Sequence, residues 1–178
     1  MMTLDETTST TDLTTTEARK IAATVMDPEM PLLTLDDLGV LREVEVRRDG
    51  SVLVTITPTY SGCPAMATMR DDIEHKLLDH GYTDVEIITS LTPAWSTDWI
   101  SEDGRRKLRE TGYSVPGPAP ARTTGPVPLT LTVRPRLIDC PQCGSSNTRL
   151  TSEFGATLCK AQYRCDDCLE PFDHVKEI

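Results

Sequence analysis

The stretch CPQCGSSNTRLTSEFGATLCKAQYRCDDC, residues 140–168, decides the fold of the C-terminal part of the chain. It begins with one C-x-x-C pair, Cys140 and Cys143, and ends with a second, Cys165 and Cys168. The separation of about twenty residues between the pairs is typical of zinc sites. Because each turn brings two thiolate sulfurs together, the two turns complete a tetrahedral four-sulfur shell that suits zinc or iron. We therefore expect these four cysteines to hold a structural Zn2+ ion in a zinc ribbon.

The alternative for the four thiols is a pair of disulfides in a secreted domain. The sequence shows no signal peptide at its start and no apolar run long enough to span a membrane. In a reducing compartment, clustered thiols bind metal more often than they pair. The expectation is therefore a cytoplasmic protein with no membrane partner.

Composition narrows the class of partner. The formal net charge is -10, and acidic residues outnumber basic ones in the ribbon segment itself. Nucleic-acid binding depends on clustered Lys and Arg, so we expect no nucleic-acid partner, although zinc ribbons are common in transcription proteins. A protein partner fits better. Aromatic residues make up only 4% of the chain, so the main core must be aliphatic.

The chain divides into four segments by composition and periodicity. The expected segments are a disordered tail rich in Thr, Asp and Ser, an α/β domain, a Pro/Gly-rich linker and the zinc ribbon, at residues 1–13, 14–112, 113–135 and 136–178. The linker either docks on a partner or swings freely; the sequence leaves both open.

The α/β domain is predicted to have the order α-β-β-α-β. Thr14 and Glu17 form a capping box before a helical apolar stripe, and Asp49-Gly50 supplies the turn of a hairpin. Pro64 suits the first position of a second helix. The expected elements are a helix over 15–26, a hairpin over 40–58, a helix over 64–80, a strand over 84–89 and a short charged helix over 101–111.

Cys63 stands directly before the second predicted helix. The unpaired amides and the dipole at a helix N-terminus favour an anion, so this position favours a lowered thiol pKa. Thr59 and Tyr60 precede it closely enough to donate hydrogen bonds. The simpler alternative is a small buried loop residue. The sequence contains no phosphate loop, no dinucleotide fingerprint and no convincing nucleophilic triad.

Two further loops carry carboxylates, Asp27-Pro28-Glu29 and Asp37-Leu38-Gly39. Side chains at the ends of elements either cap a turn or reach into a site. Capping alone would account for Asp27 and Asp37. The alternative hypothesis is that these loops converge with Cys63 at one end of the sheet.

These residues carry a resemblance. DPEMPLLTLDDLGVLREVEV, followed by VTITPTYSGCPAM, resembles the iron–sulfur assembly domain family, which includes SufT-type and cytosolic iron–sulfur targeting factors. Joined to the C-terminal ribbon, the pattern is similar to PaaD-type subunits of the bacterial phenylacetyl-CoA monooxygenase (1,2-epoxidase) system. The match covers the chain from about Thr15 to Ile178.

The resemblance implies a compact α/β fold with Cys63 as its reactive or transfer thiol. Asp27, Glu29, Asp37 and Thr59 fall in the supporting loops of the family pattern. Such a protein is not the oxygenase itself. The resemblance implies a factor that helps mature or maintain a metal centre, the iron–sulfur cluster of the reductase, so the reductase and other monooxygenase subunits are the expected partners. Some relatives carry a further C-terminal cysteine, whose role does not transfer to this tail.

The chemistry divides the metals between the two domains. Four enclosing thiolates retain an ion, whereas a carrier needs few, partly exposed ligands to release its cargo. Zinc is therefore assigned to the ribbon, and transient iron or an iron–sulfur cluster to Cys63. Cys159, between the two C-x-x-C pairs, is either a small buried residue or a second thiol that meets Cys63 or the client cluster.

Other function classes stay open beside the accessory factor, which is not expected to turn over substrate by itself. One is a stable, non-catalytic interaction subunit of the monooxygenase. Another is an electron carrier with iron in the four-sulfur shell, because that shell accepts both metals. A dimer is among the oligomeric states left open.

Overall fold

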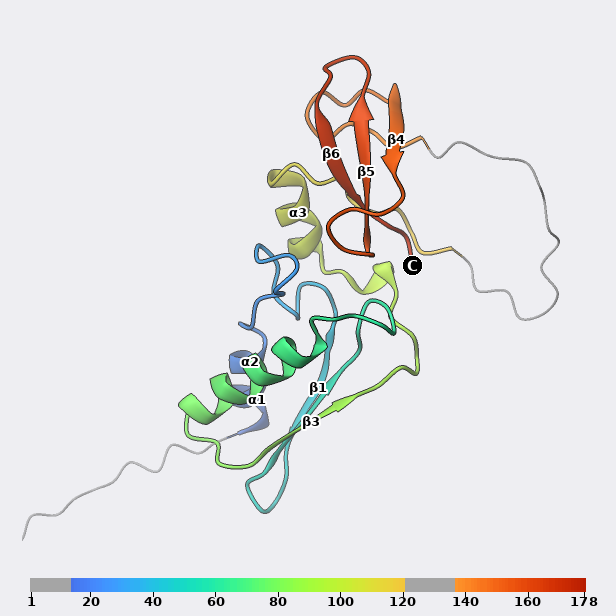
Figure 1. Ribbon diagram of the computed structural model, residues 1–178. Coiled ribbons are helices and arrows are strands. Elements are labelled where there is room, and N and C mark those ends of the chain that lie inside the picture. Colours follow the sequence, from blue (N-terminus) through green and yellow to red (C-terminus); the bar gives the residue numbers. More distant parts are fainter. Residues whose placement is uncertain (1–13, 121–136) are drawn as a thin grey trace, which may run out of the picture.

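A computed structural model describes residues 14–120 and 137–178 of the protein (Figure 1). The expected tail and residues 121–135 of the expected linker lie outside these ranges. The elements are α1 Thr15–Ala22, β1 Leu41–Val46, β2 Val52–Ile56, α2 Met66–Asp79, β3 Val85–Thr89, the 3-10 helix η1 Thr97–Trp99, α3 Glu102–Glu110, β4 Thr148–Ser152, β5 Lys160–Cys165 and β6 Pro171–Val175. The expected α-β-β-α-β order and the separate C-terminal ribbon are both confirmed.

The first domain is a three-stranded sheet in the order β1-β2-β3. β1 and β2 form the expected antiparallel hairpin, in which Val46 faces Val52 next to the turn. β3 pairs with β2 in parallel, so α2 is the crossover between them. α1 packs on β1 and on α2, while α2 packs on β3, which places both helices on one face of the sheet. The buried side chains of α2 are Met69, Ile73 and Leu77.

Two predicted helix boundaries differ from the structure by more than one residue. α1 ends at Ala22, because the chain closes a turn at Thr24, whose N–H donates to the carbonyl of Ile21. α2 begins at Met66 rather than at Pro64. Both differences shorten a helix by the residues of a terminal turn, the part of a helix that sequence patterns place least well.

The core of the first domain is largely aliphatic, as expected. It takes residues from the long loop between α1 and β1 as well as from the sheet, with Leu33, Leu35 and Leu38 at most 1% exposed. Trp95 joins this core, and its indole N–H donates to the carbonyl of Leu38 at 2.8 Å. Hence the loop that carries the predicted carboxylates is fixed by packing.

Gly39 explains part of the Asp-Leu-Gly motif. Its φ of +66° lies in the left-handed region that favours glycine. A Cβ at this position would also lie 2.7 Å from the Cβ and the carbonyl oxygen of Trp99. The chain therefore needs glycine here, so that η1 can pack closely on the loop.

The ribbon is an antiparallel sheet in the order β4-β5-β6 with a core of its own. The buried residues of this core are Ile138, Cys140, Ala161, Tyr163, Cys165 and Phe172. The Tyr163 and Phe172 rings stack with their centroids 5.9 Å apart. Phe172 thus packs within the ribbon.

The ribbon packs against the first domain. Ser114 forms a parallel bridge with His174 of β6, and its N–H donates to the carbonyl of Asp173 at 2.9 Å. Val175 is 2% exposed and belongs to the core of the first domain. The N–H of Thr97 donates to the carbonyl of Ile178, and Figure 1 shows the C-terminus at the junction. The first residues of the expected linker therefore pair with the ribbon.

Candidate functional site

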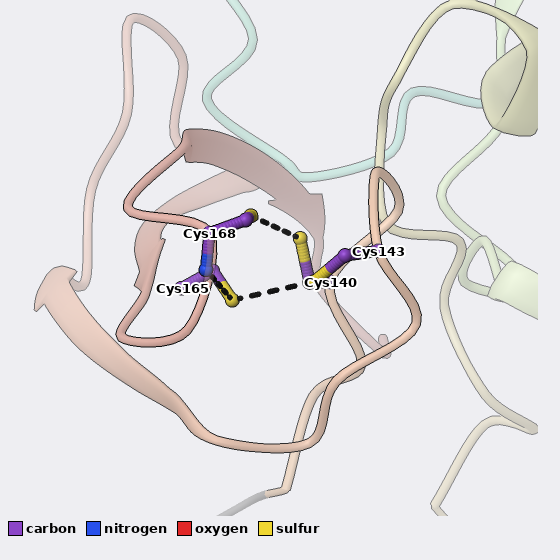
Figure 2. Close-up of side chains that lie close together, drawn as sticks. All are labelled: Cys140, Cys143, Cys165 and Cys168. Atoms are coloured by element: carbon purple, nitrogen blue, oxygen red, sulfur yellow. Dashed lines mark hydrogen bonds between the residues drawn. The ribbon is translucent and has the colours of Figure 1, made fainter.

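The four ribbon cysteines form a metal-binding site. Their sulfurs all lie within 4.8 Å of one another, and Figure 2 shows the four side chains converging from two turns. Cys140 and Cys168 have their Sγ atoms 3.7 Å apart, and those of Cys143 and Cys165 are 3.6 Å apart. A Zn–S bond of about 2.3 Å in tetrahedral geometry gives an S–S edge of about 3.8 Å. The four sulfurs therefore fit one tetrahedral ion.

Local backbone geometry builds these two turns. Gly144 has φ +74°, and its N–H donates to the carbonyl of Cys140 at 2.8 Å. In the second turn the N–H of Cys168 points at the Cys165 sulfur, 3.5 Å away. This amide and that of Asp167 lower the pKa of the Cys165 thiol to about 7, which prepares it to ionise and bind a cation.

Cys63 lies at the end of the loop that leads into α2, and it is 8% exposed. Burial raises the pKa of its thiol, and the charges of Glu29 and Asp27 raise it further. The Ala65 amide and the Tyr60 hydroxyl lower it, but by less. The expected lowering of the thiol pKa is therefore wrong for the metal-free protein, because desolvation and two carboxylates outweigh the helix terminus.

The Asp27 carboxylate caps its own turn, and its charge contributes to the electrostatics of Cys63. Oδ1 of Asp27 accepts from the N–H groups of Glu29 at 2.8 Å and Met30 at 2.6 Å, so the residue caps its own turn. It is also 3% exposed and acts electrostatically on Cys63. Burial raises the pKa of Asp27 and, together with the Asp27 charge, that of Glu29. The carboxylates of this loop therefore contribute to the raised pKa of the Cys63 thiol.

Cys159 lies in the ribbon, and the charges of the same two carboxylates act on its thiol. It is 4% exposed, and its sulfur lies 3.1 Å from the Thr157 hydroxyl. Burial raises the pKa of the Cys159 thiol, and the charges of Glu29 and Asp27 add to the increase. The pKa of Tyr60 is raised by burial and by the charges of Cys63, Glu29 and Cys159. The charges of Asp27 and Glu29 therefore raise the pKa of a buried thiol in each domain.

Asp37 contacts α3 and the N-cap of that helix. Its carboxylate accepts from the Lys107 ammonium at 2.6 Å and from the Thr34 N–H at 2.9 Å. Burial by itself would raise the pKa of Asp37, but these two donors hold it below its usual range. Its main-chain carbonyl accepts from the N–H of Ser101, the N-cap of α3. These contacts match the capping alternative. Thr59 lies half-buried in the Cys63 loop.

Sequence reasoning missed Lys160. This residue begins β5 and is 4% exposed, and its charge acts on Asp27, Glu29 and Cys159. Its ammonium lies over the Tyr113 ring, 5.6 Å from the centroid. A buried lysine is unusual unless something compensates its charge. The sequence signal that could have identified Lys160 was its position next to Cys159, because neighbouring residues lie at the same end of a strand.

Two further observations concern possible metal sites and membrane-spanning helices in the described residues. Over residues 14–120 and 137–178, the ribbon cysteines are the one set of three or more metal-ligand side chains close enough to hold an ion. No helix in these ranges has the length and apolar character needed to cross a membrane.

Two family models match the chain, one on each domain. A model described as iron-sulfur cluster assembly protein matches residues 18–88, from α1 to β3, and so includes Asp27, Glu29 and Cys63. A model described as PaaD zinc beta ribbon domain matches residues 124–176, which hold all four ribbon cysteines. Both parts of the sequence resemblance are therefore confirmed.

Comparisons with individual proteins divide the chain into the same two parts. The chain is 44% identical over 154 residues to a putative 1,2-phenylacetyl-CoA epoxidase subunit of Escherichia coli, a match that covers 86% of this chain and 87% of the relative. It is 36% identical over 90 residues to an Fe-S protein maturation auxiliary factor of Porphyromonas gingivalis, covering 50% and 85%. The crystal structure of a domain of unknown function, DUF59, from Bacillus anthracis matches with a TM-score of 0.50 at 22% identity, over 53% of this chain and 90% of that one. This last likeness concerns the fold of the first domain.

Proposed function

The chain belongs to the family of PaaD-type subunits of the 1,2-phenylacetyl-CoA epoxidase, and on that premise we propose that it is an accessory factor that assembles or maintains the iron–sulfur cluster of the reductase in this system. The observation that carries the proposal is the environment of Cys63. A buried thiol, two carboxylates whose charges act on it and an iron–sulfur assembly domain occur together in one chain.

The metals are divided between the domains. We assign a structural Zn2+ to Cys140, Cys143, Cys165 and Cys168, because four thiolates at the edge length of a tetrahedron retain an ion. When bound, zinc supplies a fixed tetrahedral crosslink and no redox chemistry. Iron or an iron–sulfur cluster is cargo in this proposal, and Cys63 is the ligand that accepts and releases it.

The raised pKa of the Cys63 thiol links cargo binding to loss of a proton and cargo release to its return. At neutral pH the thiol is protonated in the metal-free protein, so it has no strong affinity for small electrophiles. Cargo binding requires Sγ to lose its proton. Glu29 is half-buried and its charge acts on Cys63, and we assign it as the proton acceptor, since burial brings its pKa closer to neutral than that of an exposed carboxylate. Proton return to Sγ then favours release.

A second candidate function, a stable interaction subunit of the epoxidase, is favoured by one observation. The ribbon exposes large apolar side chains, Phe154 at 56% and Leu158 at 52% among them. Exposed apolar side chains that lie together are typical of protein interfaces. In that case the protein would bind the complex permanently and Cys63 would be dispensable.

Reconstitution of the reductase tests the proposal. Reductase stripped of its cluster is incubated without oxygen with ferrous iron and sulfide, in the presence or absence of the full chain. We expect the chain to increase the rate at which cluster absorption and electron transfer return. Cys63→Ser should abolish this increase, while Ser61→Ala, an exposed position in the same loop, should keep it.

The two candidate functions then give different outcomes. Full activity of Cys63→Ser would contradict the accessory role and support the interaction subunit. Circular dichroism and zinc content establish that each variant is folded before it is assayed.

A further inference from the structure

Over the described residues, the two sheets have four outer strands, and three of their free edges are covered or interrupted. α1 covers the outer edge of β1, where the Thr15 hydroxyl accepts from the N–H of Val46 at 3.0 Å. β6 pairs with Ser114, and the register of β4 shifts between Leu150 and Ser152. Such features prevent an edge from pairing with a foreign strand.

β3 has none of these features. It pairs with β2 in an uninterrupted parallel register. The Asp84 carbonyl, before the strand, accepts from a β2 N–H at 2.8 Å, and the Ser90 N–H, after it, donates to a β2 carbonyl at 2.9 Å. Backbone groups alternate in direction along a strand, so those of Val85, Ile87 and Thr89 point away from β2. Within residues 14–120 and 137–178, no hydrogen bond occupies these outward groups.

α2 and β3, which lie side by side in Figure 1, form a groove of about 330 Å3 along this edge. The residues that line it are Val85 and Ile87 of β3 and the exposed Ala67, Arg70, Asp71 and Glu74 of α2. The four α2 positions follow the spacing of one helix face, so this wall extends over about 10 Å at 1.5 Å per residue. An extended chain rises about 3.3 Å per residue, so about three residues fit along the groove.

The groove combines apolar surface with carboxylates that are free to bind a cation. Asp71 and Glu74 make no ion pair or side-chain hydrogen bond in the part of the chain that the structure describes, and neither does Arg70. Two carboxylates and one guanidinium leave the lining with a net negative charge. A Lys or Arg side chain suits this lining, because its aliphatic stem covers apolar surface while its charged end reaches a carboxylate.

We propose that the free edge of β3 and the groove beside it bind an extended, basic segment of a partner protein by strand addition. Main-chain hydrogen bonds to Val85, Ile87 and Thr89 give affinity, and Lys or Arg at alternate positions of the segment gives specificity. The surface contains neither Cys63 nor any ribbon residue. The inference therefore goes beyond the proposed function, and it applies equally to an accessory factor and to a stable interaction subunit.

A second copy of this chain fits the surface less well than a basic segment does. Two β3 edges that paired with each other would bring two negatively charged grooves together, in a protein whose formal net charge is -10. Like charges that face each other across a strand pair destabilise it. Charge therefore favours a partner of opposite sign.

Fluorescence anisotropy of a labelled peptide, Thr-Lys-Val-Lys-Val-Lys-Thr, titrated with the zinc-loaded full chain tests strand addition. We expect saturable binding of one peptide per chain. Two N-methylated versions of the peptide, one modified at the Lys residues and one at the Val residues, separate strand addition from charge attraction. Alternate N–H groups of a strand face its neighbour, so one version should bind about tenfold or more weakly and the other should bind like the parent. Equal binding of all three peptides would overturn the proposal.

Thr89→Pro tests the edge from the side of the protein. Thr89 is exposed and its N–H points outward, so proline removes an edge donor without breaking the ladder to β2. Peptide binding should weaken by about tenfold or more, whereas the matched control Thr89→Val keeps the N–H and should bind like wild type. Circular dichroism establishes that both variants are folded. Wild-type affinity in a folded Thr89→Pro would contradict the proposal.

A second pair of variants tests the groove without changing the strand. Asp71→Asn combined with Glu74→Gln should weaken binding by about three- to tenfold, because two exposed ion pairs with the peptide are lost. Glu43→Gln combined with Glu45→Gln is the matched control, since it removes the same charge from exposed positions of β1, at the opposite edge of the sheet. It should leave the affinity unchanged. An equal loss in both double variants would show non-specific charge attraction and overturn the assignment of the groove.

The remaining outcomes concern the occupant and the proposed function. Sedimentation of the full chain that shows a dimer, dissociated by Thr89→Pro but not by Thr89→Val, would assign the edge to a second copy and overturn the proposal. Absence of peptide binding would also overturn it. Neither result would alter the comparison of Cys63→Ser with wild type in the reductase assay, because that assay depends on a different part of the domain.

Discussion

Loss of one ribbon ligand should unfold the ribbon and leave the first domain folded. The large apolar side chains of the ribbon core are Ile138, Tyr163 and Phe172. Their burial contributes roughly 1.5–3 kcal/mol each, and hence about 5–9 kcal/mol together. A structural zinc ion contributes about 10–16 kcal/mol, more than this whole core. Cys165→Ser removes a fully buried ligand, so the remaining core cannot offset the entropy of ordering the ribbon.

The junction adds a smaller effect on the first domain. Val175 and Ile178 pack against its core from the ribbon side, and burial of a valine stabilises by about 1.5–3 kcal/mol. When the ribbon unfolds, the first domain should therefore lose about 2 kcal/mol of unfolding free energy yet stay folded.

Hydrogen exchange read by mass spectrometry measures both effects in one experiment. In Cys165→Ser, amides of β4, β5 and β6 should exchange as in an unfolded chain, while those of β2 and α2 stay protected. Cys159→Ser is the matched control, because Cys159 is a buried ribbon cysteine outside the four-sulfur shell. It should keep both zinc and ribbon protection. Normal ribbon protection in Cys165→Ser would refute the reasoning.

The remaining predictions concern the carboxylates and the thiols. Asp37→Asn should lower the unfolding free energy at pH 7 by about 1–3 kcal/mol, because it weakens the contact with Lys107. The pKa of Asp37 is lowered in the folded state, so its contribution to the unfolding free energy is present above the unfolded pKa of about 3.9 and is lost as the pH falls through the folded value. Urea titrations at pH 7 and pH 3 check the sign of this dependence. Asp27→Asn keeps the capping oxygen and should raise the unfolding free energy at pH 7, the opposite of Asp37→Asn. The reason is that the pKa of Asp27 is raised in the folded state, so its contribution to stability is lost as the pH rises through the folded value. A large loss of stability at pH 7 in Asp27→Asn would argue against this. Cys63 should react with iodoacetamide faster than Cys159 but more slowly than a free thiol at pH 7, as both thiols have raised pKa values and Cys159 is more buried; peptide mapping measures the order, and faster labelling of Cys159 would count against it.

Features that depend on short-range pattern could be predicted from the sequence. The two C-x-x-C turns place their sulfurs by local backbone geometry, so the spacing alone identified the four ligands. The hairpin followed from its turn and its alternation, and the crossover helix followed from its apolar stripe. The Thr14 cap is likewise local, and its hydroxyl accepts from the Glu17 N–H at 3.2 Å.

The environment of Cys63 could not be predicted in the same way. A position before a helix favours a lowered pKa, but the actual direction depends on burial and on carboxylates more than thirty residues earlier in the chain. Both are products of tertiary packing. The sequence left open whether both carboxylate loops converge on Cys63. In the structure Asp37 binds Lys107 of α3, and the charges of Asp27 and Glu29 raise the pKa of the Cys63 thiol.

The place of Cys159 depends on how the ribbon docks. That docking rests on the bridge between Ser114 and His174 and on burial of Val175, and neither has a local sequence signal. The sequence could therefore name Cys159 as a candidate but could not choose between a small buried residue and a thiol that faces the first domain.

Metal, sulfide and visible absorption of anaerobically purified protein test the central claim, that cargo binds at Cys63 while the ribbon keeps its own ion. Wild type and Cys63→Ser are compared side by side. The account predicts a single zinc ion in both proteins, with additional iron in the wild type that is absent from Cys63→Ser. Iron in place of zinc in both proteins would contradict it, because the redox-active metal would then lie in the four-sulfur shell, as an electron carrier requires.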